Sequence, residues 1–89
     1  MEFEFDQEKS AANTTKRGIG FVQAQVLWDD PNRVEVPART VGEPRWLVVG
    51  RIAELHWSAV VTYRDQRVRI ISVRRSRPEE VSLYGRDDD

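Results

Sequence analysis

Residues 56–75 read HWSAVVTYRDQRVRIISVRR, and this stretch decides the fold. Residues 56–64 are rich in Trp, Val, Thr and Tyr, the residue types that β-strands favour. Residues 67–75 alternate arginines with Val, Ile and Ser, as a half-buried strand does. Since only Asp65 and Gln66 separate the two segments, the stretch predicts an antiparallel β-hairpin.

Two further strands are expected before this hairpin. Residues 33–39 alternate, with Val34 and Val36 on one side. Residues 46–49 (WLVV) form a continuous apolar run, which is typical of a strand buried on both faces. A turn is expected at 41–44. Because the connections are short, the four strands should form an antiparallel meander.

Helices are expected at both ends of the chain. Asp6 can cap a helix over residues 7–16, and Gly18 can end it in a left-handed turn. Residues 21–29 carry apolar side chains at i, i+3, i+6 and i+7, which predicts a second helix. Residues 78–84 begin with a proline, which suits the first turn of a closing helix.

The order of these elements predicts the α+β class, with two N-terminal helices, a four-stranded antiparallel sheet and a C-terminal helix. We expect one domain over residues 1–86 and an acidic tail at 87–89. The helices should cover one face of the sheet and leave the other face free for a ligand.

The formal net charge of −1 conceals an uneven distribution along the chain. Residues 1–8 carry −4, residues 9–63 carry +2, residues 64–77 carry +5 and residues 78–89 carry −4. A basic segment therefore lies between acidic ends, and the near-neutral total does not argue against a nucleic-acid ligand.

Several classes of site and location are disfavoured. The chain has no cysteine, so disulfides, thiolate metal sites and cysteine nucleophiles are excluded. No apolar run approaches the ~20 residues of a membrane span, and no signal peptide is recognisable, so we expect a cytoplasmic protein without membrane contact. No Walker loop, dinucleotide fingerprint or metal-binding constellation is present, which predicts an activity that needs neither cofactor nor metal.

The arginines of residues 67–75 are the strongest candidates for a binding surface. Regular alternation places Arg67, Arg69 and Arg75 on one face of the strand and Arg74 on the other, unless a bulge intervenes. Beside Arg45 of a neighbouring strand, they would hold several phosphates. The alternative is a solvated strand whose arginines prevent edge-to-edge aggregation. From the residues alone, both interpretations stay open.

Other conspicuous side chains have ordinary explanations. His56 is the sole histidine, and its place at a strand start is more typical of a surface residue than of an acid–base catalyst. The periodic positions of Trp28 and Trp57 favour the core. Trp46 adjoins Arg45 and is the best candidate for stacking on a base, although core packing is the more common role for tryptophan.

A series of short segments between about residue 3 and residue 84 has a specific order and spacing. They are FDQEK (5–9), Asn13, KRGIGF (16–21), Ala24, WDD (28–30), EPR (43–45), VG (49–50), VVTY (60–63), RIISVRR (69–75), Glu80 and Tyr84. Together they resemble the BrnT toxins of type II toxin–antitoxin systems.

This resemblance implies a RelE-like ribonuclease fold and RNA cleavage that inhibits translation. It also implies neutralisation by a BrnA antitoxin, whose ribbon-helix-helix domain binds operator DNA. Binding to DNA would then belong to the partner, and this chain would reach the operator only through it.

The resemblance also implies a set of site residues. Metal-independent cleavage uses the ribose 2′-hydroxyl as nucleophile, so the protein has to hold phosphate, stabilise negative charge and move protons. The arginines and Lys16 suit the first two tasks, and Glu43, Glu80 and Tyr84 suit proton transfer or orientation. The catalytic candidates are Lys16, Glu43, Arg45, Arg69, Arg74 and Tyr84. The candidates for RNA contact are Arg17, Trp46, Arg67, Arg75 and Glu80.

Two positions depart from the pattern of the family. The family usually has histidine where this chain has Arg17, and often has aspartate where it has Gly20. Arginine does not release its proton at neutral pH, so we expect reduced cleavage. One alternative function is therefore a weakened toxin that acts as antitoxin-binding partner and operon co-repressor. Another is a plain nucleic-acid-binding domain.

Overall fold

The computed structural model describes residues 1–38 and 42–85. Its elements are β1 (Glu2–Glu4), α1 (Gln7–Arg17), α2 (Phe21–Ala24), the 3₁₀-helix η1 (Gln25–Asp29), β2 (Val34–Pro37), β3 (Trp46–Ile52), β4 (Leu55–Arg64), β5 (Arg67–Arg75) and α3 (Pro78–Val81). This arrangement belongs to the predicted α+β class. The tail at 87–89 and one residue of the turn at 41–44 lie outside the described residues.

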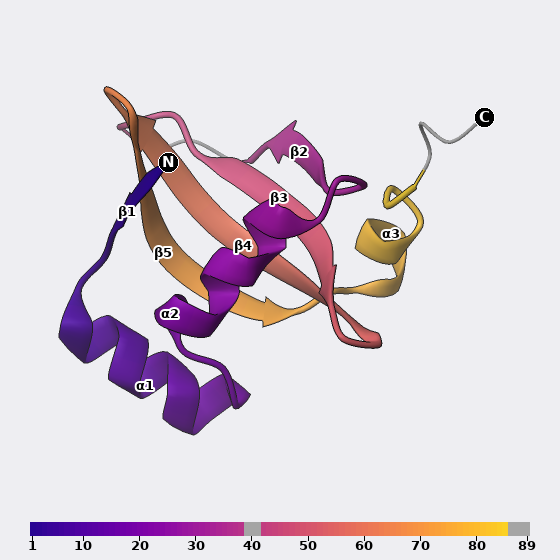
Figure 1. Cartoon of the computed structure of the whole chain (residues 1–89), viewed down its shortest axis with the longest axis horizontal. Helices are drawn as coiled ribbons and strands as arrows, with labels where there is room; N and C mark the ends of the chain where they lie inside the picture. The colour runs from indigo at the N-terminus through magenta and orange to yellow at the C-terminus, as the bar shows by residue number, and fades with distance from the viewer. Residues whose placement is uncertain (39–41, 86–89) are drawn as a thin grey trace.

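The sheet has five strands in the order β1-β5-β4-β3-β2 (Figure 1). Strands β2 to β5 form the antiparallel meander that the sequence predicts. Strand β1 is an additional edge strand, and it pairs in parallel with the start of β5. The prediction of a four-stranded, wholly antiparallel sheet was therefore wrong. Three residues are too few to show a periodic pattern, and their pairing partner lies far away in the sequence.

A β-bulge in β5 changes which arginines share a face. The register between β4 and β5 shifts near the middle of the strands, where Ile71 has no partner. This extra residue brings Arg74 onto the face of Arg67 and Arg69, and it turns Arg75 to the opposite face. The prediction that Arg75 shares a face with Arg67 and Arg69 holds only for regular alternation and was wrong here; the alternative of an intervening bulge is the one that the structure shows.

Helix α1 begins and ends as predicted. The Asp6 carboxylate accepts hydrogen bonds from the backbone N–H groups of Glu8 (2.8 Å) and Lys9 (3.2 Å). Gly18 follows the helix with a φ of 80°, and its N–H donates to the carbonyl oxygen of Thr14 at 2.9 Å. A residue without a Cβ adopts this left-handed conformation readily, which explains why the helix ends here.

The other two predicted helices are shorter than expected. Residues 21–29 form one turn of α-helix (α2) followed by the 3₁₀-helix η1, so the prediction of one continuous helix was wrong. A segment of nine residues is too short to gain much stability from helix propagation, and α-helices often end in a 3₁₀ turn. Helix α3 ends at Val81, and residues 82–85 continue as turns rather than as the predicted helix to 84.

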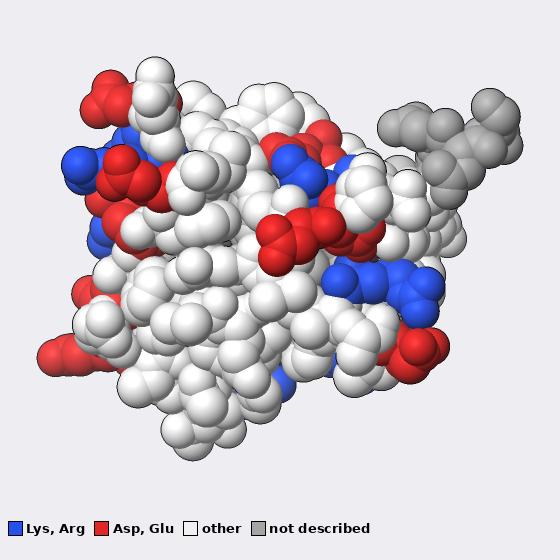
Figure 2. Space-filling view, viewed as in Figure 1, with Lys and Arg blue, Asp and Glu red and all other residues white. Residues whose placement is uncertain are grey.

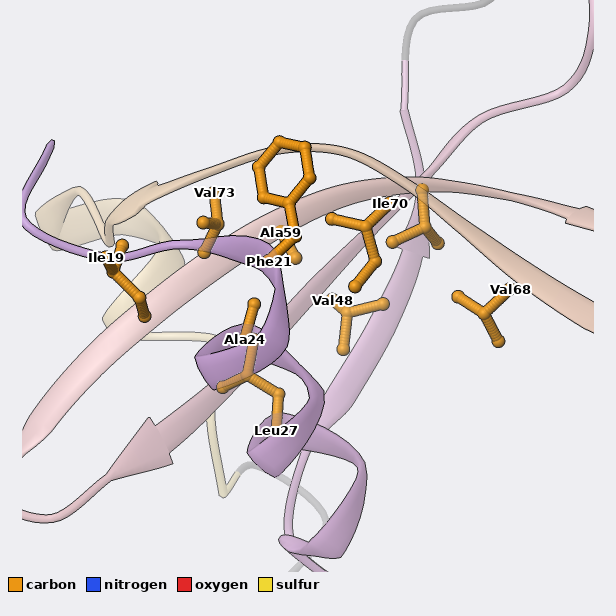
Figure 3. Packing of buried hydrophobic residues seen from close by; sticks show 10 residues of the cluster. Ile19, Phe21, Ala24, Leu27, Val48, Ala59, Val68, Ile70 and Val73 are labelled. Atoms are coloured by element: carbon orange, nitrogen blue, oxygen red, sulfur yellow. The ribbon is translucent and has the colours of Figure 1, made fainter. Parts of the chain in front are cut away.

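The hydrophobic core lies between the sheet and the α2–η1 segment, which crosses the face of the sheet turned to the viewer in Figure 1. Phe21, Ala24 and Leu27 point from this segment toward the strands (Figure 3), and all three are buried, as their spacing predicts. They pack against Val48 and Ile70 of the sheet. Each large side chain buried here contributes about 1.5–3 kcal/mol.

The opposite face of the sheet is covered in two places, so the prediction of a free face was wrong. The Ser58 hydroxyl donates to the Glu80 carboxylate of α3 at 2.8 Å. The Thr62 hydroxyl donates to the carbonyl of Pro44 at 2.8 Å. Val49, which lies on the same face as Ser58, is fully buried. Across the described residues, no helix has the length and apolar character needed to cross a membrane.

Candidate functional site

An open cavity of about 440 Å³ is lined entirely by basic side chains. Two of them come from the end of α1, two from the end of β5, and one from the connection to α3. The lining residues are Lys16, Arg17, Arg74, Arg75 and Arg77. Guanidinium and ammonium groups are strong donors to phosphate oxygens, so the cavity suits a phosphodiester backbone.

Asn13 brings the two basic segments together. Its Nδ2 donates to the carbonyl oxygens of Ile19 (2.8 Å) and Val73 (2.9 Å), and its Oδ1 accepts from the N–H of Val73 at 3.4 Å. Strand β1 pairs with β5 only as far as Arg69. Beyond that point, the Asn13 side chain takes the place of a neighbouring strand and hydrogen-bonds to the backbone of β5 at Val73. The last turn of α1, which ends at Arg17, is thereby fixed beside the end of β5.

Arg74 is held in place by Glu80. The two side chains form a bidentate ion pair, with hydrogen bonds of 2.8 and 2.7 Å. The carboxylate of Glu80 also accepts from the Ser58 hydroxyl and from the N–H of Arg77 at 2.9 Å. Glu80 is 7 % exposed, and the hydrogen bonds from Arg74 hold its pKa at about 2. Glu80 therefore serves here as a fixed anion that orients Arg74.

The other cations of the cavity are not neutralised in this way. Within residues 1–38 and 42–85, no carboxylate lies within ion-pairing distance of Lys16, Arg17, Arg75 or Arg77. Lys16 and Arg17 also lie in the last turn of α1, where the helix dipole favours positive charge. The cavity thus combines one oriented guanidinium with several whose donors are available to a ligand.

The remaining predicted phosphate ligands lie elsewhere, near the turn between β4 and β5. Arg64 makes a bidentate ion pair with Glu43, with hydrogen bonds of 2.9 and 2.7 Å, which lowers the pKa of the Glu43 carboxyl. The positive charges of Arg69 and Arg45 also lower the pKa of Glu43. Nε of Arg67 lies 3.8 Å from Oε1 of Glu2 in β1. Acidic residues therefore balance this second basic cluster, in contrast to the cavity.

The predicted aromatic and proton-transfer residues are not part of the cavity either. The ring of Trp46 packs edge-on against Tyr63, with centroids 6.5 Å apart. The Tyr84 hydroxyl donates to Asp30 at 2.7 Å. Burial and this hydrogen bond raise the pKa of Tyr84, whereas hydrogen bonds from Tyr84 and from backbone N–H groups outweigh burial and lower the pKa of Asp30. His56 packs against the ring of Tyr84 at 4.8 Å. Of the predicted site residues, the cavity contains only Lys16, Arg17, Arg74 and Arg75, with Glu80 directly behind them.

Three further residues contribute to the site and were not predicted as parts of it. Arg77 lines the cavity, and its place at the end of the basic run 64–77 is the signal that could have found it. Asn13 joins the two basic segments, and no local pattern reveals that contact. Trp57 packs against the core, as predicted, and the guanidinium of Arg75 also lies over its ring, 5.6 Å from the centroid.

The broad face that carries α2 and η1 has a different character. Figure 2 shows that much of this face is uncharged, with an acidic side chain near its middle and further Lys, Arg, Asp and Glu side chains toward its left and right sides. Its large uncharged area lacks the cationic side chains that bind phosphate. In the part of the chain that the structure describes, no group of three or more His, Asp or Glu side chains could hold a metal ion.

A comparison with known families shows where the chain belongs. The family model described as the ribonuclease toxin BrnT of type II toxin–antitoxin systems matches residues 5–80. The chain belongs to the BrnT family. All five cavity residues lie within the matched region, whereas β1 and Tyr84 lie outside it. No curated protein matches the sequence. As a BrnT protein, the chain belongs with ribonuclease toxins whose partners are an antitoxin and an RNA substrate.

Proposed function

We propose that this BrnT chain cleaves RNA in the cavity formed by Lys16, Arg17, Arg74, Arg75 and Arg77, and that cleavage requires no metal ion. The observation that carries the proposal is the positive charge of the cavity, most of which no acidic side chain balances. Its five lining residues are all basic, and four of them have no carboxylate partner among the described residues. A polyanion is the ligand that such a site binds best.

The proposed reaction is a transesterification within the RNA strand. The 2′-hydroxyl oxygen attacks the adjacent phosphorus, a new P–O2′ bond forms and the P–O5′ bond breaks. The products are a 2′,3′-cyclic phosphate and a 5′-hydroxyl. Negative charge accumulates on the phosphoryl oxygens in the transition state, and preorganised cations stabilise it there.

We assign separate roles to the cavity residues. Arg74 is oriented by Glu80 before the substrate arrives, so its guanidinium can stabilise the phosphoryl oxygens without reorganising. Arg75 and Arg77 bind neighbouring phosphates. Lys16 is an ammonium donor at neutral pH and supplies the proton to the leaving 5′-oxygen. Water accepts the proton of the 2′-hydroxyl, since arginine at position 17 does not.

The cellular role follows from RNA cleavage. Loss of messenger RNA stops translation in the cytoplasm, as in ribonucleases of the RelE-like class. An antitoxin with a ribbon-helix-helix domain neutralises the toxin and carries the complex to operator DNA, so this chain contacts the operator through its partner. No cofactor takes part.

The test is cleavage of a short RNA in the presence of EDTA. We expect products with 2′,3′-cyclic phosphate and 5′-hydroxyl ends, and no cleavage at a position that carries a single 2′-deoxy substitution. Cleavage that stops in EDTA, or that continues at the 2′-deoxy position, would overturn the proposed chemistry.

Arg17 favours a second candidate function. Because arginine replaces the family's histidine within the cavity, the chain would retain the phosphate-binding site and the antitoxin partner while cleaving slowly. It would then act mainly as an antitoxin-binding partner and operon co-repressor. Arg17→His should raise the cleavage rate at pH 7, because imidazole can accept a proton there. Equal rates for the two proteins would contradict this explanation.

A further inference from the structure

Trp57 lies at the border between the core and the basic cavity. It pairs with Gly50 of β3 on one side and with Arg75 of β5 on the other. The next residue on the same face of β4 is Ala59, which is fully buried, whereas the Trp57 side chain is partly exposed. Its indole ring is therefore the aromatic surface that the strand presents at this end of the sheet.

Arg75 connects this aromatic surface to the cavity. Its guanidinium lies over the Trp57 ring, 5.6 Å from the centroid, and the same side chain lines the cavity. Arg75 is exposed and makes no ion pair within the described residues. The donors at the edge of the guanidinium are available to a phosphate, and its plane is available for stacking.

The chemistry of a nucleotide matches this pair of neighbouring surfaces. One sugar joins each base to its phosphate, so the base next to a bound phosphate reaches the residues that border the phosphate site. Proteins that bind single-stranded RNA stack the unpaired bases on aromatic rings or on arginine planes. Lys16, Arg17 and Arg77 also supply charge to the cavity, but within residues 1–38 and 42–85 Arg75 is the cavity cation that lies over an aromatic ring.

We propose that Trp57 and Arg75 form a nucleobase-stacking subsite that takes the base adjacent to the phosphate bound in the cavity. This inference rests on the proposed function, and it adds a contact with the base to the contacts with the backbone. Since every base has a π-face, the subsite should accept single-stranded RNA with little sequence preference and disfavour paired RNA, whose bases are stacked on each other.

The test compares two ligands that differ only in their bases. One is a short single-stranded DNA oligonucleotide, which has no 2′-hydroxyl and is not cleaved. The other has the same length and charge but carries abasic sugars. Fluorescence anisotropy measures both affinities. We expect the oligonucleotide with bases to bind about tenfold more tightly, which is the size of one base–aromatic stack.

Three variants assign that difference to the subsite. Trp57→Leu should bring the affinity ratio close to one. Arg75→Lys keeps the charge and removes the guanidinium plane, so the affinity for the strand with bases should fall more than the affinity for the abasic strand, and the ratio should fall. It alters an exposed side chain and keeps the test valid if Trp57→Leu does not fold. Tyr63→Leu, an aromatic change at the other end of β4, should leave the ratio unaltered.

The outcomes separate this inference from the proposed function. Equal binding of the two ligands by the unmodified protein, or an unchanged ratio in Arg75→Lys, would overturn the stacking subsite and leave the phosphate site intact. Failure of the protein to bind either strand would overturn the phosphate site and the subsite together.

Discussion

Replacing Glu80 with glutamine should destabilise the domain and remove part of its sensitivity to acid. Glutamine has nearly the shape of glutamate, so the substitution removes the charge while preserving the packing of α3. Arg74 would lose its anionic partner, and the hydrogen bonds from Ser58 and Arg77 would reach a weaker acceptor.

The size of the effect follows from the pKa of Glu80. A fall from the ordinary 4.5 to about 2 corresponds to about 3 kcal/mol of folding free energy. Because the folded-state pKa is lowered, this stabilisation is present above about pH 4.5 and is lost as the pH falls toward 2. About 2 kcal/mol of it should be lost by pH 3.

Urea denaturation at pH 7 and pH 3 measures these values. Glu80→Gln should be less stable than the unmodified protein by about 3 kcal/mol at pH 7 and by about 1 kcal/mol at pH 3. The matched control is Glu79→Gln, which removes the same charge from an exposed neighbouring position and should change stability by less than about 0.5 kcal/mol. Similar losses in the two variants, or a difference that does not shrink in acid, would refute the anchoring role of Glu80.

Three further predictions concern the same region. Asn13→Ala should cost about 2 kcal/mol in urea denaturation, because it leaves both backbone groups of Val73 without their partners; a loss below about 0.5 kcal/mol would contradict this. Gly20→Ala should cost about 1 kcal/mol, because the new Cβ would lie 2.7 Å from Oγ1 of Thr14; the cost should shrink when Thr14 is also alanine. Arg75→Gln should lower the slope of log affinity for single-stranded nucleic acid against log salt by about 0.7, and an unchanged slope would show that no phosphate binds there.

Local signals in the sequence predict much of the fold. The cap at Asp6, the left-handed residue at Gly18 and the hairpin turn at residues 65–66 each depend on a few adjacent residues, and the structure confirms them. Strand β1 and the bulge at Ile71 depend instead on distant pairing, which no short window contains. A single extra residue was enough to reverse the predicted faces of Arg74 and Arg75.

The candidate site could be predicted in part for a related reason. Residue type and family pattern point to basic side chains, and four of those named do meet in the cavity. What the sequence does not reveal is which cations are already neutralised. Arg64 and Arg67 lie beside acidic residues of other segments, whereas Arg75 and Lys16 form no ion pair within residues 1–38 and 42–85. That distinction depends on tertiary contacts, and it separates the cavity from the second basic cluster.

The glycine at position 20 has a structural explanation in this chain. Gly20 is buried, and a Cβ there would meet Oγ1 of Thr14 at 2.7 Å and Oγ of Ser10 at 3.3 Å. The hydroxyl of Ser10 already accepts a hydrogen bond from the N–H of Phe21 at 3.0 Å. Glycine at this position therefore fits the hydroxyl groups of α1 that pack against it.

The measurement that tests the central claim most directly is the rate of RNA cleavage by two double variants of equal charge. Lys16→Gln with Arg75→Gln removes two cations from the cavity, and Arg51→Gln with Arg64→Gln removes two cations outside it. We predict that the cavity variant loses at least about 100-fold in rate and that the other stays within about threefold. Equal losses in the two variants, or full activity in the cavity variant, would contradict the assignment of RNA cleavage to this cavity.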